Sequence, residues 1–465
     1  MVAVIWPGDE PRDDRLTEDD AEAHVHGICF KTGPPRRVGV ELEWLVRDVR
    51  DPALPVPAER IFPAVADLTA PAVLPSPAAL PTGSMLTTEP GGQLELSSAP
   101  ADSLGECVTA VGREMTTLRE TVRRAGLALQ GYGFDPLRPP RRVLQLPRYA
   151  AMEEFFDRSG AWGREMMCST ASVQVCLDAG RDTEATGGYR WRWRLAHQIG
   201  PVLVAAFANS SLRQGRPSGW KSTREEVWAH LDPGRTQPPP AGGDPRDAYT
   251  AYALDAELML VRRPESPSWV APRGLTFRGW LRGGGNGERP PTVDDLTYHL
   301  STLFPPVRPQ GHLELRMIDA QPGDGWIVPA AVAWALFEDP RAADDAMAAA
   351  EPLWAARERI AVGAASGPRP FGNSKSPSGS RSREVSYGHH ANNSAPSGNP
   401  WLWAARYGPA DPVLARASQQ CFAAADAALG RAGVPAEIRC RVAEFAERYV
   451  TRRRCPADDQ LEGMH

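Results

Sequence analysis

The chain has 465 residues, of which 42% are apolar and 23% charged, and 52 basic against 57 acidic side chains give a net charge of −5. These values are typical of a globular protein with a sizeable core. They give no reason to expect nucleic acid or an anionic membrane as a partner. The length suits one large domain or two ordinary ones. No run of about 18 apolar residues is present, so no transmembrane helix is expected.

Capping signals and apolar periodicity divide the chain into helices and strands. Residues 17–20 resemble a capping box that opens a helix ending near Phe30. Residues 103–106 open another, in which apolar side chains recur at 4-3-4-3-4 spacing over 104–122. Further helices are predicted at 61–68, 150–158, 189–212, 246–261, 292–303, 329–349, 412–431 and 435–452, and strands at 37–46, 86–98, 127–133, 170–178 and 312–318.

One segment near the C-terminus differs in composition from the rest. Residues 362–399 are rich in Ser, Gly, Pro and Asn and contain few apolar residues, which is typical of a flexible linker or an inserted loop. We therefore expect a main domain over 1–361 and a helical C-terminal segment over 400–465 that packs on it.

The seven cysteines are scattered, with no CxxC pair and no regular spacing. This pattern favours reduced thiols and a cytoplasmic location over a disulfide framework or a zinc site.

Several of the predicted strands place carboxylates on one face and apolar side chains on the other. In a strand, residues i and i+2 point the same way. Glu41 and Glu43 therefore share a face that opposes Leu42. The same alternation sets Gln93 and Glu95 against Leu94 and Leu96, Gln174 against Val173 and Val175, and Glu314 and Arg316 against Leu313, Leu315 and Met317.

Two interpretations of these carboxylates are open. A single Glu-x-Glu is most often the solvent-facing edge of an amphipathic strand, and Glu314 with Arg316 could be a surface ion pair. Taken jointly, however, clustered carboxylates repel one another unless cations lie between them. Oxygen ligands of this kind suit Mg²⁺ or Mn²⁺ shared with nucleotide phosphates. The joint pattern favours a metal site built from Glu41, Glu43, Glu89, Glu95 and Glu314.

Four further polar residues are weaker candidates. Thr170 and Gln174 lie on or beside a predicted strand, and each alone is more often part of a polar outer face. Arg224 and Arg235 fall in the stretch after the helix at 189–212. Arginine is the natural bidentate partner of a carboxylate or phosphate, but either one alone is more often a surface residue.

Longer motifs carry a family resemblance. The chain resembles the glutamate–cysteine ligase family of the second, plant and bacterial type, within the glutamine synthetase-like superfamily. Within that family it is most similar to the actinobacterial branch that serves ergothioneine biosynthesis. The motifs that carry the resemblance are Thr88–Ser97, Pro291–Leu300, Thr302–Arg308, Leu313–Pro322 and Trp401–Gly408.

The resemblance implies a fold, a reaction and a set of site residues. The fold is α+β, a glutamine synthetase-like antiparallel sheet curved into a half-funnel and surrounded by helices, and residues 1–361 would be its catalytic domain. The reaction is ATP-dependent joining of the γ-carboxylate of L-glutamate to L-cysteine through γ-glutamyl phosphate, with Mg²⁺ or Mn²⁺ as cofactor and small molecules as the only partners. The implied metal ligands are Glu41, Glu43, Glu89, Glu95 and Glu314, the implied catalytic residues are Glu95, Glu314 and Arg316, and the implied substrate and ATP contacts are Gln93, Thr170, Gln174, Arg224 and Arg235.

Two points leave alternatives open. Cys176 stands where the family pattern has Asn, which puts fine substrate positioning in doubt. No short motif marks the acceptor pocket. A related ligase with another amine acceptor, and a protein that binds nucleotide or amino acid without turnover, are therefore the competing hypotheses.

Overall fold

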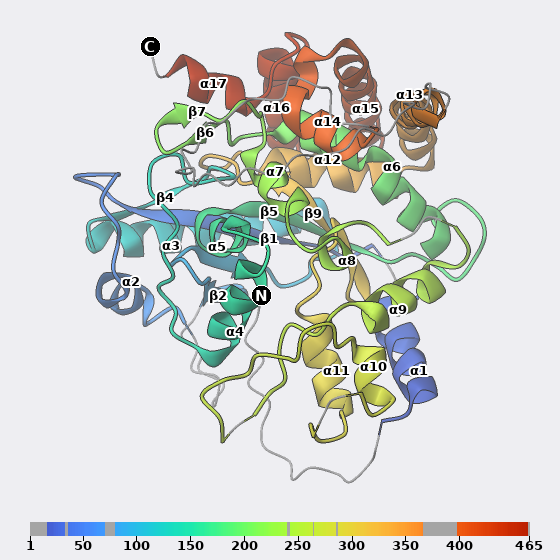
Figure 1. The fold of residues 1–465 in the computed structure, drawn as a ribbon. Coiled ribbons are helices and arrows are strands. Elements are labelled where there is room, and N and C mark those ends of the chain that lie inside the picture. The colour runs from blue at the N-terminus through green and yellow to red at the C-terminus, as the bar shows by residue number, and fades with distance from the viewer. Residues whose placement is uncertain are drawn as a thin grey trace, which may run out of the picture.

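The structure, a computed structural model, describes residues 16–32, 36–69, 80–239, 242–263, 265–284, 287–365 and 398–463. Strands and helices alternate along the first two thirds of the chain, and helices alone follow (Figure 1). The strands are β1 (Val38–Asp48), β2 (Met85–Thr88), β3 (Leu94–Ser97), β4 (Leu127–Gln130), β5 (Ser172–Asp178), β6 (Leu212–Arg213), β7 (Arg216–Pro217), β8 (Val307–Pro309) and β9 (His312–Asp319). The helices are α1 (Glu18–Cys29), α2 (Ala58–Val65), α3 (Leu104–Arg124), α4 (Pro147–Asp157), α5 (Trp162–Ser169), α6 (Tyr189–Phe207), α7 (Thr223–Ala229), α8 (Pro233–Thr236), α9 (Pro245–Asp255), α10 (Phe277–Leu281), α11 (Val293–Leu300), α12 (Ile327–Glu338), α13 (Pro340–Ala365), α14 (Pro400–Tyr407), α15 (Pro412–Arg431), α16 (Ala436–Phe445), a π-helical turn (Ala446–Val450) and α17 (Pro456–Glu462).

The central sheet has the strand order β2-β3-β1-β5-β9-β8, with β4 paired to the far end of β1. Every neighbouring pair of strands is antiparallel. The prediction of an α+β fold built on an antiparallel sheet is confirmed.

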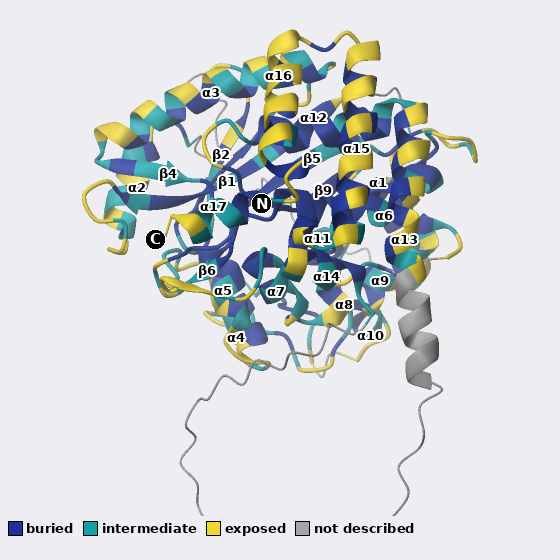
Figure 2. Cartoon of the chain, turned by 90° about the horizontal axis from the view of Figure 1, so that it is seen from above, coloured by how far each residue is buried: buried dark blue, intermediate teal, exposed yellow. Residues whose placement is uncertain are grey.

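One face of this sheet is the floor of the main hydrophobic core. Val40, Leu42, Leu94 and Leu315 project from it and are buried. Helices α3, α6 and α12 pack on this face and add their own apolar stripes. Figure 2 shows the strands buried at the centre and the exposed residues gathered on the outer sides of the helices. The opposite face of the sheet carries the polar side chains, and side chains from α4, α5 and α7 lie over it.

The C-terminal helices belong to the same core. Trp401 of α14 and Phe422 of α15 lie in one apolar cluster with Phe207 of α6. Gly200 of α6 makes this approach possible, because a Cβ at that position would lie 2.0 Å from the Trp401 ring. Helices α14, α15 and α16 therefore stack directly on the helices that cover the sheet (Figure 1).

Several predicted helix boundaries were wrong, among them the end of the helix predicted at 246–261, which is α9 and ends at Asp255. Two of the differences have a clear physical reason. The helix predicted at 189–212 ends at Phe207, because the next residues hydrogen-bond to Asp319 instead of continuing the helical ladder. The helix predicted at 329–349 is two helices, since Pro340 disfavours helical backbone at Asp339. Helices α5, α7, α8 and α10 fall where no helix was predicted, α7 and α8 in a stretch predicted to be loop over 215–237, and α14 and α17 fall in the C-terminal segment, which was predicted to be helical without a helix being placed there. Of the predicted linker at 362–399, residues up to Ala365 are helical in α13, and 366–397 lie outside the described residues.

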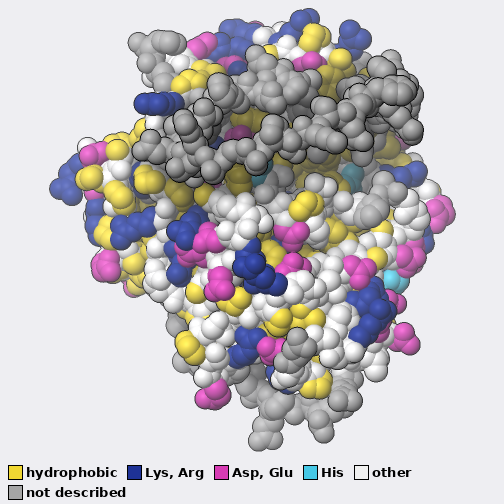
Figure 3. Space-filling view, in the orientation of Figure 1, with side chains coloured by type: hydrophobic (Ala, Val, Ile, Leu, Met, Phe, Trp, Pro, Cys, Tyr) yellow, Lys and Arg dark blue, Asp and Glu magenta, His cyan; other side chains and the backbone are white. Residues whose placement is uncertain are grey.

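The distribution of surface charge and the state of the cysteines agree with the expectations from the composition. On the face shown in Figure 3, acidic and basic side chains are interspersed rather than gathered into a patch of one sign. All seven cysteines are free. Within the described ranges, none of the helices combines the length and the apolar character needed to cross a bilayer.

A buried carboxylate fixes the turn before β2. Glu114 lies on the buried stripe of α3 and is fully buried. It accepts hydrogen bonds from the backbone nitrogens of Thr82 (3.0 Å) and Ser84 (3.2 Å) and from both of their hydroxyls. We expect Glu114→Ala to lower the free energy of unfolding by about 3 kcal/mol, because two donors of buried Ser84 and two of partly buried Thr82 lose their acceptor. Urea unfolding would measure this. Glu120→Ala, an exposed carboxylate on the same helix, should change stability by less than about 0.5 kcal/mol.

A buried histidine makes the free energy of unfolding depend on pH. Burial lowers the pKa of His299 to about 3, with Arg235 adding to the effect, and its Nε2 lies 2.8 Å from the Ala253 carbonyl. Between pH 6.5 and 3 the unfolded chain therefore binds the proton that the folded chain excludes, so stability falls as the pH falls through this window. Wild type should lose about 2 kcal/mol more than His299→Gln between pH 7 and pH 5 in urea unfolding. His26→Gln, at a side chain that is 39% exposed, should follow wild type.

Candidate functional site

The register of the sheet brings the predicted carboxylates together on its polar face. Glu43 of β1 lies directly opposite Glu95 of β3, and Glu41 lies opposite Gln174 of β5. Glu314 of β9 pairs with Cys176 on one side and with Arg308 of β8 on the other. These positions are far apart in the sequence, so alternation within each strand and antiparallel pairing between strands together build the cluster.

A cavity of about 610 Å³, including the part open to solvent, lies over this face. We call it the central cavity. Its floor is the sheet, and its walls come from α4, α5, α7 and the segment that precedes β8. Eight of the eleven predicted site residues line it: Glu43, Glu89, Gln93, Glu95, Thr170, Gln174, Arg224 and Arg316.

The turn that carries Glu89 depends on two glycines. The Glu89 nitrogen donates to the Gln93 carbonyl (2.8 Å), and Gly92, at φ +88°, donates to the Glu89 carbonyl (2.8 Å). A Cβ at Gly91 would lie 2.4 Å from the carbonyl oxygen of Cys168, so the turn can press on the end of α5 only without a side chain there. Glu89 is thereby held at the rim of the cavity.

Two of the predicted polar contacts hold this wall in place. The Nε2 atom of Gln93 donates to the carbonyls of Thr170 (2.9 Å) and Met167 (3.3 Å). The Thr170 hydroxyl donates to the carbonyl of Met166 (2.6 Å). In this state both side chains tie the end of α5 to the sheet, and they line the cavity at the same time.

Arg316 sits at an irregularity of β9. Val173 pairs with Ile318 and Val175 with Leu315, so Gln174 alone opposes both Arg316 and Met317, which is a β-bulge. The bulge frees backbone groups that find other partners. The nitrogen of Arg316 donates to the Pro306 carbonyl (2.9 Å), and its carbonyl accepts from Nη2 of Arg224 (2.6 Å).

The arginines of the site donate hydrogen bonds to carboxylates and, in the case of Arg224, to the backbone carbonyl of Arg316. Arg308 donates to Glu314 through two parallel bonds, Nε to Oε2 (2.8 Å) and Nη2 to Oε1 (2.9 Å). Nη1 of Arg316 donates to both Glu314 and Gln174. Gln174 in turn donates to Glu43 (2.9 Å), so a continuous polar network crosses the sheet from β8 to β1.

Burial and crowding set the charges in this network. Burial, together with neighbouring carboxylates, raises the pKa of Glu41 to about 8 and that of Glu43 to about 7, and burial raises the pKa of Glu89. Burial would also raise the pKa of Glu314, but the guanidinium groups of Arg308 and then Arg316 lower it to about 2. The site therefore holds one carboxylate whose charge is balanced by arginines, beside Glu41 and Glu43, in which burial and neighbouring carboxylates favour the protonated form.

The donor set for a metal ion is only partly assembled. Among the residues that the structure describes, no three Asp, Glu, His or Cys side chains are grouped closely enough to hold one. Glu314 is already paired with arginine, and Glu43 accepts from Gln174 and from the Ser172 nitrogen (2.8 Å). Carboxylates whose pKa is raised by mutual repulsion are nevertheless groups that a divalent cation would relieve.

Three predicted residues do not reach the central cavity. Glu41 and Glu314 share the polar face of the sheet but are not among the residues that line the cavity. Arg235 is fully buried elsewhere. Its guanidinium donates to the Thr302 carbonyl (2.8 Å) and to the Glu257 carbonyl, and it lies over the Phe155 ring. Arg235 therefore links α8 to the segment that follows α11.

Other cavity residues were not predicted. Arg308 is buried, lines the cavity and completes the pair with Glu314. It falls in the motif Thr302–Arg308, so the motif carried the signal, but the strand β8 is too short to show alternation. An apolar wall also escaped prediction, because its side chains look like ordinary core residues in the sequence; it consists of Tyr149, Met152, Met166, Met167, Trp228 and Phe304.

Comparison with known proteins identifies the family. The model of glutamate–cysteine ligase family 2 matches residues 37–365. The chain is 39% identical over 363 residues to glutamate–cysteine ligase EgtA of Mycobacterium tuberculosis, covering 76% of this chain and 81% of the relative. It is 40% identical over 352 residues to the EgtA of Mycolicibacterium smegmatis, covering 74% and 79%. The chloroplastic glutamate–cysteine ligase of Medicago truncatula is 34% identical over 245 residues, covering 51% of this chain and 47% of that one. The chain belongs to glutamate–cysteine ligase family 2.

Proposed function

We propose that the protein is an ATP-dependent glutamate–cysteine ligase, which joins the γ-carboxylate of L-glutamate to the amine of L-cysteine. The observation that carries the proposal is the central cavity, in which carboxylates and arginines from four strands, β1, β3, β8 and β9, meet on one face of the sheet in a chain of this family. The product, γ-glutamylcysteine, would serve ergothioneine biosynthesis, as the resemblance implies. The reaction belongs in the cytoplasm, where ATP and reduced cysteine are available.

The carboxylates suit magnesium brought in with the nucleotide. Glu43, Glu89 and Glu95 line the cavity, and burial and mutual repulsion raise the pKa of the first two. Mg²⁺ is usually bound through a few carboxylates together with substrate phosphates rather than by an all-protein cage. When bound, it would neutralise phosphate charge, and Glu43, Glu89 and Glu95 would hold it, with Glu41 and Glu314 supporting them from the same face.

The chemistry needs an activated carboxylate, because a carboxylate oxygen is a poor leaving group. An oxygen of the γ-carboxylate attacks the terminal phosphorus of ATP, and ADP leaves. The amine of cysteine then attacks the acyl carbon of γ-glutamyl phosphate, loses a proton, and expels phosphate that carries that oxygen away. Arg316 and Arg224 line the cavity and provide fixed positive charge for the phosphoryl and acyl-phosphate groups.

Two features of the chain would keep these cations effective. The network of Glu314, Gln174 and Arg308 holds Arg316 in one orientation, so little reorganisation is needed during the reaction. The apolar wall of the cavity limits the water that could hydrolyse the acyl phosphate.

The choice of acceptor is tested by measuring phosphate release from ATP with glutamate and a panel of amines. We expect cysteine to give the fastest release, and release to require both glutamate and Mg²⁺. Faster release with another amine would favour a related ligase with a different acceptor. Tight nucleotide binding without release for any amine would favour a protein that binds without turnover.

A further inference from the structure

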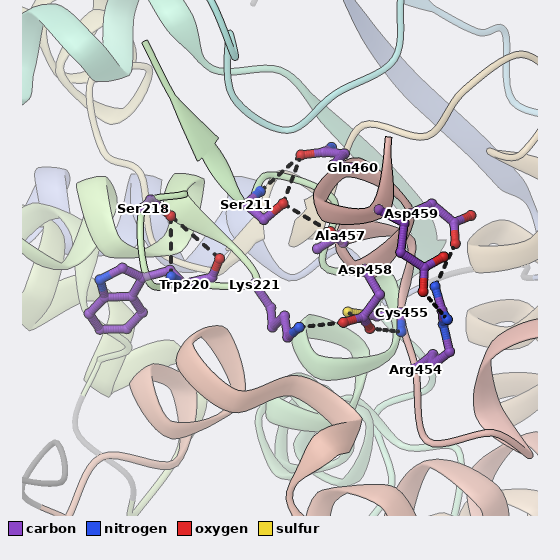
Figure 4. Close-up of polar contacts among 11 residues, drawn as sticks. Ser211, Ser218, Trp220, Lys221, Arg454, Cys455, Ala457, Asp458, Asp459 and Gln460 are labelled. Atoms are coloured by element: carbon purple, nitrogen blue, oxygen red, sulfur yellow. Dashed lines mark hydrogen bonds and ion pairs between the residues drawn. The ribbon is translucent and has the colours of Figure 1, made fainter. Parts of the chain in front are cut away.

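The last helix of the chain, α17, lies outside the stretch matched by the family model, yet it is docked on the loop that follows α6 (Figure 4). Nε2 of Gln460 donates to the carbonyl oxygen (2.7 Å) and to Oδ1 (2.8 Å) of Asn209, and its Oε1 accepts from the backbone nitrogen of Ser211 (3.0 Å). The Ser211 hydroxyl donates to the Ala457 carbonyl (2.9 Å), and the Ala457 nitrogen donates to the Ala208 carbonyl (2.9 Å). Helix α17 therefore provides hydrogen-bond partners for backbone groups of the loop and for the side chains of Asn209 and Ser211.

The same helix also holds a second loop. Asp458 accepts from Nζ of Lys221 and, through its other oxygen, from the Cys455 nitrogen (2.9 Å), as Figure 4 shows. Lys221 is one of only three lysines in the chain. It immediately precedes Ser222, the residue that caps the N-terminus of α7.

The two loops meet at a buried carboxylate at the end of β9. Asp319 accepts from the backbone nitrogen of Asn209 (2.8 Å), from the Ser210 hydroxyl (2.6 Å) and from the Ser222 hydroxyl (2.9 Å). The Arg224 nitrogen donates to Ser210 Oγ (3.3 Å). The loop over 209–211, the end of β9 and the start of α7 are thus one hydrogen-bonded unit, and α17 closes it from outside.

This unit sets the position of a residue in the central cavity. Arg224 is the second residue of α7, lines the cavity, and bonds through Nη2 to the carbonyl of Arg316 at the bulge of β9. We propose that α17 is a positioning element for the reaction. In this inference, which rests on the proposed function, Gln460 and Lys221 hold the two loops so that Arg224, and with it the bulge at Arg316, keeps its place.

Burial explains why solvent would not replace these contacts. Asn209, Ser210 and Ser211 are all buried, with 2% exposure or less. A buried loop that loses Gln460 would leave Oδ1 of Asn209 and the Ser211 nitrogen without the partners they have here, at the desolvation penalty of each group, while the Asn209 carbonyl would keep, among the described residues, only the Gly133 nitrogen (3.0 Å). The loop would then shift to find other partners, and because Asn209 and Ser210 both bond to Asp319, the shift would reach α7.

The test compares Gln460→Ala with Glu462→Ala in the full-length protein. Glu462 lies on the same helix, its side chain is 64% exposed, and within the described residues its ion pair is with Arg454, so it is the matched control. For Gln460→Ala we expect kcat/KM to fall about tenfold, since small displacements of a positioned group have effects of this size. The melting temperature should stay within about 3 °C of that of the control. Amide hydrogen exchange at 209–211 and 223–227 should become faster in the free protein.

Two further variants keep the test decisive if Gln460→Ala folds poorly. Gln460→Glu retains the acceptor for Ser211 but loses the donor to Asn209, and should give an intermediate loss of kcat/KM. Lys221→Met keeps the sequence of α17, removes the cation that pairs with Asp458, and should also lower kcat/KM and raise exchange at 223–227.

The inference is overturned if Gln460→Ala and Lys221→Met both match Glu462→Ala in kcat/KM, or if exchange at 223–227 does not change. If wild type forms no product with any amine, the proposed function fails, and the exchange comparison alone then decides whether α17 positions α7.

Discussion

Replacing Glu314 or Glu95 by alanine is expected to lower kcat about 100-fold or more. Glu314 is the fully buried partner of Arg308 and Arg316. Its loss therefore leaves the buried guanidinium of Arg308 and the partly buried one of Arg316 without their carboxylate, and it misplaces the charge that faces the acyl phosphate. Glu95 lies between Glu43 and Thr87 on the floor of the cavity, where it would contribute to neutralising the phosphates through the metal. Steady-state ADP release, normalised to folded protein, measures both.

Stability must be separated from chemistry in this experiment. Removing one partner of a buried ion pair costs about 3–5 kcal/mol, so Glu314→Gln, which keeps the volume, is the companion variant. It should retain the fold and still lose most of the turnover. Glu120→Ala, exposed on α3, is the control for handling and should stay within twofold of wild type. Near-normal turnover in both Glu95→Ala and Glu314→Ala would contradict the assignment of the carboxylates.

Arg316→Lys should also be a poor enzyme, with kcat lowered about 100-fold. One nitrogen of the Arg316 guanidinium donates to Glu314 and Gln174 at once, while its backbone is fixed at the bulge. A lysine ammonium carries the same charge but is a flexible point donor that does not present a planar fork. Single-turnover measurement of ADP formation would show whether the loss lies in phosphoryl transfer.

A conservative change elsewhere gives the comparison for Arg316. Arg431→Lys alters a partly exposed arginine paired with Asp339, far from the central cavity, and should keep kcat within twofold. If Arg316→Lys also kept its kcat, then charge alone would be enough and the fixed orientation of the guanidinium would have no part in the reaction.

The parts of the fold that could be predicted from the sequence are those in which one local pattern decides the structure. Two-residue alternation around Glu41 and Glu43 was enough to predict which face of β1 is polar, and the capping box at 17–20 gave the start of α1. Short elements carry no such pattern. β8 has three residues and α17 seven, and α5 lies in a stretch without clear periodicity, so tertiary contacts decide whether they form.

The same distinction between local pattern and tertiary contact applies to the residues of the site. Glu41, Glu43, Glu95 and Glu314 could be predicted to share the polar face because each sits in an alternating strand, and Arg316 because it follows two residues after Glu314. Their roles in the reaction stay a prediction. The bulge at Arg316 was missed although Met317 and Ile318 are consecutive apolar residues, which breaks the alternation. Arg235 was predicted to contact substrate, but a buried arginine bonded to carbonyls and an arginine in a cavity look alike in a sequence. Arg308 was not predicted, because an arginine that lines a cavity cannot be told from any other arginine in a sequence.

The most direct test of the central claim is a single incubation of purified protein with ATP, Mg²⁺, cysteine and glutamate labelled with ¹⁸O in its γ-carboxylate. Mass spectrometry would quantify γ-glutamylcysteine, ADP and the label in phosphate. We predict one ADP for each γ-glutamylcysteine, with one ¹⁸O transferred to each phosphate, because the carboxylate oxygen leaves with the phosphoryl group. ADP without γ-glutamylcysteine would mean that the acceptor is another amine. The absence of both products, or phosphate that carries no label, would contradict ligation through γ-glutamyl phosphate.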